Sequence, residues 1–193
     1  TPCNGLFAHT DFVLIATTND TTCELFRIAG EVTESLTPNL DFYPGAILGF
    51  IEFEGRIYFD GTDANGTQLW STDGQSLLRE TSLVNSIQNG DRLIIGNEEL
   101  ILSHGNGLMI FGDSLTTMQG EFSNLSIANG NLVYNSGTNI HIGSNFYPGE
   151  IHSYVIHHLG YDWFIATTDS EGPELHRHDG NTLVRISAFT SSP

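Results

Sequence analysis

Residues 15–30, IATTNDTTCELFRIAG, return near the end of the chain as residues 165–180, IATTDSEGPELHRHDG. The two stretches have equal length, and about half of their positions are identical at an offset of 150 residues. A third, related stretch, GTDANGTQLWSTDG, spans residues 61–74. Repetition on this scale is typical of folds that are built from successive copies of one supersecondary unit.

Two weaker copies, LILSHGNGLMIFGDS and LVYNSGTNIHIGSN, lie between the middle and the last of these stretches. Each copy has one apolar residue in the place of the leucine of the Glu-Leu pair, and we use this residue as its anchor. The five anchors are Leu25, Leu69, Leu108, Ile140 and Leu175. Their spacings of 44, 39, 32 and 35 residues average about 38, which is close to the length of a four-stranded propeller blade.

Each copy predicts about four short strands joined by tight turns. An apolar strand, a polar turn and the anchor strand come first, and Asp73-Gly74 or Asp179-Gly180 then marks a hairpin turn. The predicted apolar strands span 12–15, 57–59, 100–102, 132–134 and 163–165. The predicted closing strands span 77–81 and 183–187, and predicted leading strands span 47–53 and 153–158. We find no convincing helix, because apolar residues do not recur at helical spacing.

A second repeat supports this phasing. Residues 41–47, DFYPGAI, return as residues 145–151, NFYPGEI, and each copy stands just before a predicted leading strand. Proline cannot donate a hydrogen bond to a neighbouring strand, so both copies are expected in connectors.

These patterns predict an all-β fold, namely a five-unit β-propeller-like ring of short antiparallel sheets. Ring closure would let each sheet be covered by its two neighbours, and it would place the first and last copies side by side. We expect a single domain, 1–193, whose five degenerate repeats span about 5–44, 45–84, 85–120, 121–148 and 149–190. The alternative is a β-sandwich or β-solenoid of hairpin repeats.

Residues 61–74 resemble the "GT…G-ELW-x-(S/T)DGT" repeat of secreted and cell-surface microbial proteins, which form propeller-like arrays. Residues 24–27, ELFR, and 174–180, ELHRHDG, resemble it more weakly, and the third and fourth copies have lost both the acidic residue and the tryptophan. The resemblance covers about half of the chain and implies an extracellular scaffold or adhesion role. It implies structural roles for the repeated residues and brings no catalytic residue.

The charge of the chain limits its partners. The net charge is −17, and all six basic residues are arginines. Nucleic acid is excluded as an expected partner because phosphate binding needs a basic patch, and an anionic membrane surface is disfavoured for the same reason. No apolar run approaches the length of a membrane span, so we expect no membrane insertion.

Two cysteines, Cys3 and Cys23, predict one disulfide that closes the N-terminal segment. Three N-glycosylation patterns begin at Asn19, Asn65 and Asn124. Together with a start at Thr1 rather than Met, these features favour a processed, exported protein.

Histidine is the first candidate metal ligand. His176 and His178 alternate on one predicted strand, so they share a face, and His141 has the position in its copy that His176 has in the last copy. A site of these three histidines would hold Cu or Zn. The competing interpretation is that His141 and His176 replace the aromatic residues of other copies in packing.

An acidic turn is the second candidate metal site. Asp60, Asp63 and Asn65 place three oxygen-bearing side chains in one loop, which suggests Ca²⁺. The competing interpretation is a solvated turn held by side-chain hydrogen bonds to its own backbone.

Catalysis is not expected. Glu52 and Glu54 alternate on a predicted strand and would share a face, as a glycoside hydrolase-like site requires, but the connectors are too short to build a cleft. The chain contains no Gly-x-Ser-x-Gly elbow, P-loop or haem-attachment motif.

The sequence therefore favours a non-catalytic extracellular binding or scaffold module that recognises a glycan or a surface protein. The candidate residues for stacking on a sugar ring are Tyr43, Tyr147, Tyr154 and Tyr161. Two alternatives stay open: a self-associating structural subunit of an extracellular filament or surface layer, and a His-based metal-binding protein.

Overall fold

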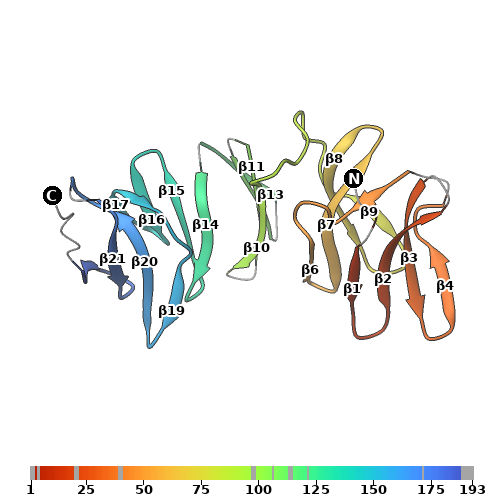
Figure 1. Ribbon diagram of the computed structural model, residues 1–193, viewed down its shortest axis with the longest axis horizontal. Helices are drawn as coiled ribbons and strands as arrows, with labels where there is room; N and C mark the ends of the chain where they lie inside the picture. Colours follow the sequence, from red (N-terminus) through yellow and green to blue (C-terminus); the bar gives the residue numbers. More distant parts are fainter. Residues whose placement is uncertain are drawn as a thin grey trace. The chain divides into compact units, whose positions relative to one another are not determined.

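The computed structural model describes Cys3 and residues 5–19, 22–38, 41–96, 99–105, 107–112, 115–120, 122–170 and 172–187. Every regular element among them is a β-strand, so the predicted all-β fold is confirmed (Figure 1). In this part of the chain no helix is long and apolar enough to cross a bilayer.

The strands form five small sheets, numbered here in chain order. Sheet 1 contains β1 (Leu6–Ala8), β2 (Val13–Asn19), β3 (Thr22–Ala29) and β4 (Val32–Ser35). Sheet 2 contains β5 (Tyr43–Pro44), β6 (Phe50–Phe53), β7 (Arg56–Asp63), β8 (Gly66–Thr72) and β9 (Leu77–Arg79). Sheet 3 contains β10 (Arg92–Gly96), β11 (Glu99–His104), β12 (Gly107–Phe111) and β13 (Leu115–Gln119). Sheet 4 contains β14 (Phe122–Ala128), β15 (Asn131–Ser136), β16 (Asn139–Ile142) and β17 (Asn145–Pro148). Sheet 5 contains β18 (Glu150–Ile151), β19 (Ile156–His158), β20 (Tyr161–Thr167), β21 (Glu174–His178) and β22 (Leu183–Arg185).

Within each sheet the strands lie in the order in which the chain forms them, as the repeat predicts for a propeller blade. The predicted apolar strands lie in β2, β7, β11, β15 and β20, except that the first begins one residue before β2. The chain forms two compact units, residues 1–93 and 94–193. The expectations of a single domain and of closure into a ring stay predictions.

In the first unit, sheets 1 and 2 pack face to face. Their shared core contains Leu14 and Leu25 from sheet 1 and Ile57 and Phe59 from sheet 2, all buried. Trp70 packs against the same cluster, and its indole N–H donates to the carbonyl of Gly61 at 3.1 Å. The apolar residues that alternate along each strand therefore meet across two sheets rather than within one.

In the second unit, sheet 4 has a packed neighbour on each face. Leu125 and Tyr134 form a cluster with Ile101 and Leu108 of sheet 3. On its other face, Val133, Ile140 and Ile142 form a cluster with residues of sheet 5. The sheet 5 members are Ile151, Phe164 and Ala166.

Sheets 2 and 5 depart from the simple four-stranded plan. The expected leading strands at 47–53 and 153–158 are each shorter, β6 and β19, and each follows a separate two-residue strand that pairs with the same partner. The interruption in sheet 2 is held by the buried Asp60 carboxylate, which accepts hydrogen bonds from the backbone N–H groups of Ile47 and Leu48. In sheet 5 the Ser153 hydroxyl has the equivalent task and accepts from the N–H of Ile165 at 2.8 Å.

The two Phe-Tyr-Pro-Gly copies are not structurally equivalent, contrary to the expectation that both are connectors. Tyr43 and Pro44 form the first strand of sheet 2, whereas residues 145–148 form the outermost strand of sheet 4. Phe42 is fully buried and Phe146 is exposed. The same four letters take different environments because packing against the neighbouring sheet, not local propensity, decides which strand they join.

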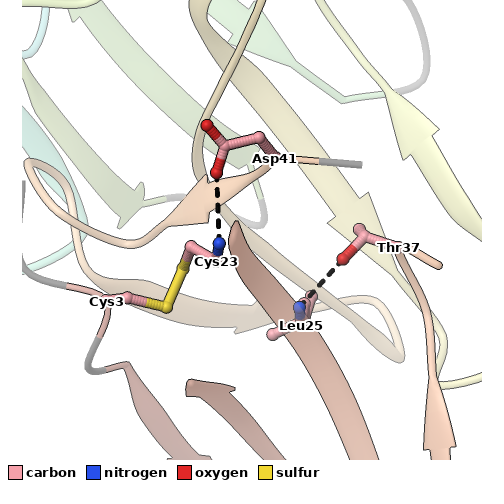
Figure 2. The surroundings of a disulfide bond; sticks show 5 residues. All are labelled: Cys3, Cys23, Leu25, Thr37 and Asp41. Atoms are coloured by element: carbon pink, nitrogen blue, oxygen red, sulfur yellow. Dashed lines mark hydrogen bonds between the residues drawn. A yellow bond between two sulfur atoms is a disulfide. The ribbon is translucent and has the colours of Figure 1, made fainter. Parts of the chain in front are cut away.

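A hydroxyl group twelve residues after the anchor recurs in sheets 1, 2 and 5. The backbone N–H of Leu25 donates to Thr37 Oγ1 at 2.9 Å (Figure 2). Leu69 donates to Thr81 at 3.0 Å, and Leu175 donates to Ser187 at 2.9 Å. These bonds satisfy a strand N–H where β4, β9 or β22 has already ended, and they fasten the returning chain to each sheet.

The predicted disulfide between Cys3 and Cys23 is present (Figure 2). It joins the segment before β1 to the start of β3, and the N–H of Cys23 also donates to the Asp41 carboxylate at 3.1 Å. The N-terminal segment is thereby fixed to the strand that carries the first anchor.

We expect the double variant Cys3→Ala/Cys23→Ala to lose about 3 kcal/mol of unfolding free energy, because the crosslink restricts a loop of about 20 residues in the unfolded chain. Urea unfolding followed by circular dichroism measures this loss. A reducing agent should destabilise the parent protein by a similar amount and leave the variant unchanged; equal sensitivity of both would contradict the prediction.

Candidate functional site

Two adjoining hollows lie between sheets 4 and 5. They have volumes of about 330 and 430 Å³, and both are lined by Pro148, Thr168 and Asp169. Sheet 4 contributes the 137–138 turn and β17, and sheet 5 contributes β18 and the loop after β20. We call the two hollows together the 4–5 groove.

Charged and hydroxyl groups of sheet 5 line this groove. Arg185 Nη1 lies 2.8 Å from Asp169 Oδ2, and both side chains are partly exposed. His152 Nε2 lies 2.8 Å from the hydroxyl of Thr167. The groove thus offers a guanidinium, a carboxylate, an imidazole and hydroxyls to a ligand rich in hydrogen-bonding groups.

His176 orients the side chain of Thr168, which lines the groove. Its Nδ1–H donates to the carbonyl of Glu174 at 3.0 Å, so its Nε2 accepts from the Thr168 hydroxyl at 3.1 Å. The His176 side chain is buried and its ring stacks on Phe164 with the ring centres 6.3 Å apart. This histidine therefore packs like the aromatic residues of other copies and also orients a hydroxyl in the groove.

Behind the groove, a buried carboxylate lies between two histidines. Asp162 is 2% exposed, and its Oδ1 accepts from His157 Nδ1 at 2.7 Å. Its Oδ2 lies 3.7 Å from Nδ1 of His178, which is 1% exposed. The Tyr147 hydroxyl donates to the carbonyl of Asn181 at 2.8 Å, so His178 Nε2–H donates to the Tyr147 oxygen at 3.1 Å. This chain of polar contacts links sheet 5 to Tyr147 in the groove.

The equivalent positions of sheets 1 and 2 do not carry a pair like Asp162 and His178. Asp162 lies opposite His178 in the register of β20 and β21, and the equivalent pair in sheet 2 is Ile57 opposite Thr72. In sheet 1 it is Val13 opposite Ile28. Burial of ionisable groups is unfavourable unless they are paired. Sheet 5 therefore has a polar contact between Asp162 and His178 where sheet 1 has apolar packing.

The expected three-histidine metal site is not formed. Within the described residues, no group of three or more His, Cys, Asp or Glu side chains is placed to hold a metal ion. Both ring nitrogens of His176 and His178 face hydrogen-bond partners in the protein. His141 instead stacks on Tyr134, with ring centres 4.7 Å apart, so the packing interpretation holds for it.

The acidic turn of sheet 2 does not converge on a cation either. The Asp60 carboxylate is buried and turned toward the Ile47 and Leu48 N–H groups, and its burial raises its pKa despite these bonds. Asp63 accepts from the backbone N–H of Asn65 at 2.7 Å and faces the Asn65 amide at 3.3 Å. The oxygens that were expected to share a Ca²⁺ ion hold two different backbone segments.

Of the four candidate tyrosines, Tyr147 lines the 4–5 groove. Burial, with the nearby Asp179 carboxylate, raises its pKa. Tyr161 lies under the guanidinium of Arg177, 4.3 Å from its ring centre, and Tyr154 is exposed before β19. Tyr43 belongs to sheet 2, where the Asp41 carboxylate raises its pKa. Tyr147, Tyr154 and Tyr161, which belong to the same unit, have different surroundings.

The glycosylation patterns differ in accessibility. Asn65 lies exposed in the turn between β7 and β8. The side-chain amide of Asn124, in the bulge of β14, donates to the carbonyl of Ile151 at 2.6 Å. The side chain of Asn19 lies outside the described residues.

The carboxylate pair considered for glycoside hydrolysis is not on one strand. Glu52 belongs to β6 and lies 3.6 Å from His9 Nε2. Glu54 follows the strand, in the turn before β7, with φ of 49°. The expected alternation on one face therefore fails, because the hairpin begins two residues after Glu52.

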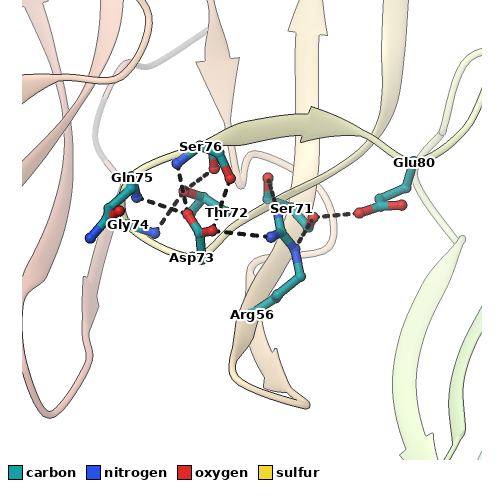
Figure 3. A network of polar contacts seen from close by, with 8 residues as sticks. All are labelled: Arg56, Ser71, Thr72, Asp73, Gly74, Gln75, Ser76 and Glu80. Carbon is teal, nitrogen blue, oxygen red and sulfur yellow. Dashed lines mark hydrogen bonds and ion pairs between the residues drawn. The ribbon is translucent and has the colours of Figure 1, made fainter.

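The Asp-Gly turn of the repeat that resembles a known family has a structural role (Figure 3). Asp73 Oδ1 accepts from the backbone N–H groups of Gln75 and Ser76 at 2.8 and 2.7 Å. These N–H groups are the main cause that lowers the Asp73 pKa to about 2, with a further contribution from Arg56, whose Nη1 lies 3.4 Å away. Asp179 in sheet 5 accepts from Asn181 and Thr182 in the same way, and its pKa is also lowered.

Asp73→Asn should lose stability at pH 7, by about 1 kcal/mol or less because the side chain is 42% exposed and screened by water. The folded pKa lies below the unfolded value of about 3.9, so the carboxylate stabilises the fold above pH 4 and loses this effect as pH falls toward 2. Urea unfolding of both proteins between pH 7 and pH 2 should therefore show converging stabilities. A constant difference over this range would contradict the assignment.

We expect Asp162→Ile alone to lose about 2 kcal/mol, because it removes the buried carboxylate that accepts from His157 and faces the buried His178. The double variant Asp162→Ile/His178→Thr installs the sheet 2 pair and should recover most of that loss. Urea unfolding at pH 7 of the parent, both single variants and the double variant gives the coupling energy. A double variant no more stable than Asp162→Ile would show that this pair is not an independent unit.

Comparison with known proteins gives no family. No family model matches the chain, and no curated protein matches it. A solved GH43 glycoside hydrolase, engineered to display both endo-xylanase and exo-arabinofuranosidase activity, aligns with a TM-score of 0.32 and 10% identity. The alignment covers all of this chain and 42% of that one. A likeness this distant carries no argument about function, so the proposals below depend on the described residues.

Proposed function

We propose that the protein is a non-catalytic extracellular binding module that holds a glycan in the 4–5 groove. The observation that carries the proposal is the groove itself, two adjoining hollows with the size of small-ligand sites. Asp169 and Arg185, which line it, form an ion pair that can exchange hydrogen bonds with sugar hydroxyls.

Two hydroxyl groups of residues that line the groove are held in place by hydrogen bonds within the protein. Thr168 is oriented by the buried His176, and the Tyr147 hydroxyl is oriented by His178 and Asn181. The Tyr147 oxygen keeps one lone pair for a donor hydroxyl of a ligand. Polar groups that are held before binding lose little conformational entropy when the ligand arrives.

An extracellular location fits the disulfide, because disulfides persist in oxidising compartments. The resemblance of residues 61–74 to secreted and cell-surface repeats points the same way. The strongly acidic composition favours a neutral or basic ligand over an anionic one.

A glycan array probed with the full chain, followed by calorimetry on the best glycan, tests the proposal. Arg185→Gln should weaken binding at least about tenfold, the loss of a charge-assisted hydrogen bond. Arg79→Gln is the matched control, because Arg79 lies opposite Trp70 in sheet 2 as Arg185 lies opposite His176 in sheet 5.

The control should bind as the parent does. The proposal fails if the parent binds no glycan on the array. It also fails if the two arginine variants bind alike, because the groove would then not be the site.

A further inference from the structure

Three hairpins of the chain share one turn geometry and differ at one residue. Two-residue turns join β6 to β7 in sheet 2, β14 to β15 in sheet 4 and β19 to β20 in sheet 5, and both residues of each turn have positive φ. The turns are Glu54-Gly55, Asn129-Gly130 and Leu159-Gly160. The first residue is polar in two of them and leucine in the third, with φ angles of 49°, 48° and 53°.

Neither the backbone nor the fold explains leucine at this position. The left-handed region is unfavourable for a bulky side chain and is tolerated better by asparagine. Leu159 is also 79% exposed, so it gains little from burial within the described chain. A residue that is unfavourable on both counts points to a role outside the folded chain.

Further apolar groups accompany Leu159 on the same hairpin. Ile156 is 65% exposed and lies opposite Trp163, whose indole N–H donates to the carbonyl of His158 at 3.2 Å. Tyr154, just before β19, is 71% exposed. In Figure 1 the β19–β20 hairpin ends in a narrow turn at the tip of sheet 5. The hairpin thus carries exposed aliphatic side chains together with aromatic residues.

The charge around the hairpin differs from that of the whole chain. Residues 151–161 contain no Asp or Glu, in a protein that has 23 of them. The next carboxylate, Asp162, is buried and bound to His157. The hairpin itself therefore brings no exposed carboxylate to the phosphate groups of a surface, whereas the net charge of −17 of the chain repels an anionic surface.

We propose that this hairpin docks on a zwitterionic phospholipid bilayer, with Leu159 and Ile156 entering the boundary between headgroups and acyl chains. Elements that lie in the plane of a bilayer bind by burying exposed apolar side chains at this boundary, and the hairpin tip carries such side chains. Tyrosine and tryptophan rings are favoured at headgroup depth. The hairpin lies on the interface and does not span the bilayer, and this docking is independent of the 4–5 groove.

Sedimentation of the full chain with phosphatidylcholine vesicles tests this proposal. Leu159→Asn installs the residue of the equivalent turn in sheet 4, so the variant should have a melting temperature no lower than the parent. Its partition onto vesicles should fall about ten- to a hundredfold, the effect expected when one leucine is no longer buried. Leu115→Asn is the matched control, because Leu115 of β13 is also exposed but lies on another sheet.

The control should partition as the parent does, and added phosphatidylserine should weaken binding because both surfaces are then negative. The proposal is overturned if the parent does not sediment with phosphatidylcholine vesicles, or if it binds only anionic ones. It is also overturned if the two leucine variants partition alike. A lower melting temperature for Leu159→Asn would show that leucine serves the fold.

Discussion

The structure depends on one packing constraint: each small sheet has apolar side chains on both faces and cannot bury them alone. In sheet 2, Leu69 is fully buried on one face while Phe59 and Trp70 lie on the other. Sheet 1 covers the latter face, and sheet 4 is covered on both sides within its own unit. A four-stranded sheet of this size gains a core only by stacking, which is why the chain repeats one unit.

The features on which the proposals depend lie where one copy departs from the repeat. Sheet 5 replaces an apolar pair by Asp162 and His178, places His176 where sheet 2 has Trp70, and carries Leu159 where other turns are polar. The buried ionisable pair and the leucine at positive φ are each unfavourable for the sheet taken alone. The same exchange of packing for polar or exposed groups is common at binding sites, because stability and activity place different demands on a position.

The polar residues that recur at equivalent positions of the repeats have structural roles. Glu24 and Glu174 accept from the hydroxyls of Ser35 and Ser187, and both carboxylates are buried. Gln68, at the equivalent position of sheet 2, accepts from the Leu83 N–H at 2.7 Å. In sheets 1 and 5 the acidic residue of the Glu-Leu pair thus holds the last strand or the chain that follows it, so its recurrence along the sequence marks fold and not chemistry.

The sequence by itself determined the all-β class, the repeat and the positions of the central strands, because period-two apolar patterns and Asp-Gly turns are local properties. It also identified the Cys3–Cys23 pair, which an even cysteine count suggests. The tertiary structure decided which side chains meet. The sequence offered His141, His176 and His178 as one site, but register and stacking give each a different partner. The groove was missed because its residues come from two sheets and no short motif joins Tyr147 to Arg185. Leu159-Gly160 could have been noticed in the sequence, because the two equivalent turns, Glu54-Gly55 and Asn129-Gly130, begin with a polar residue. The exposure of Leu159, however, is a property of the fold.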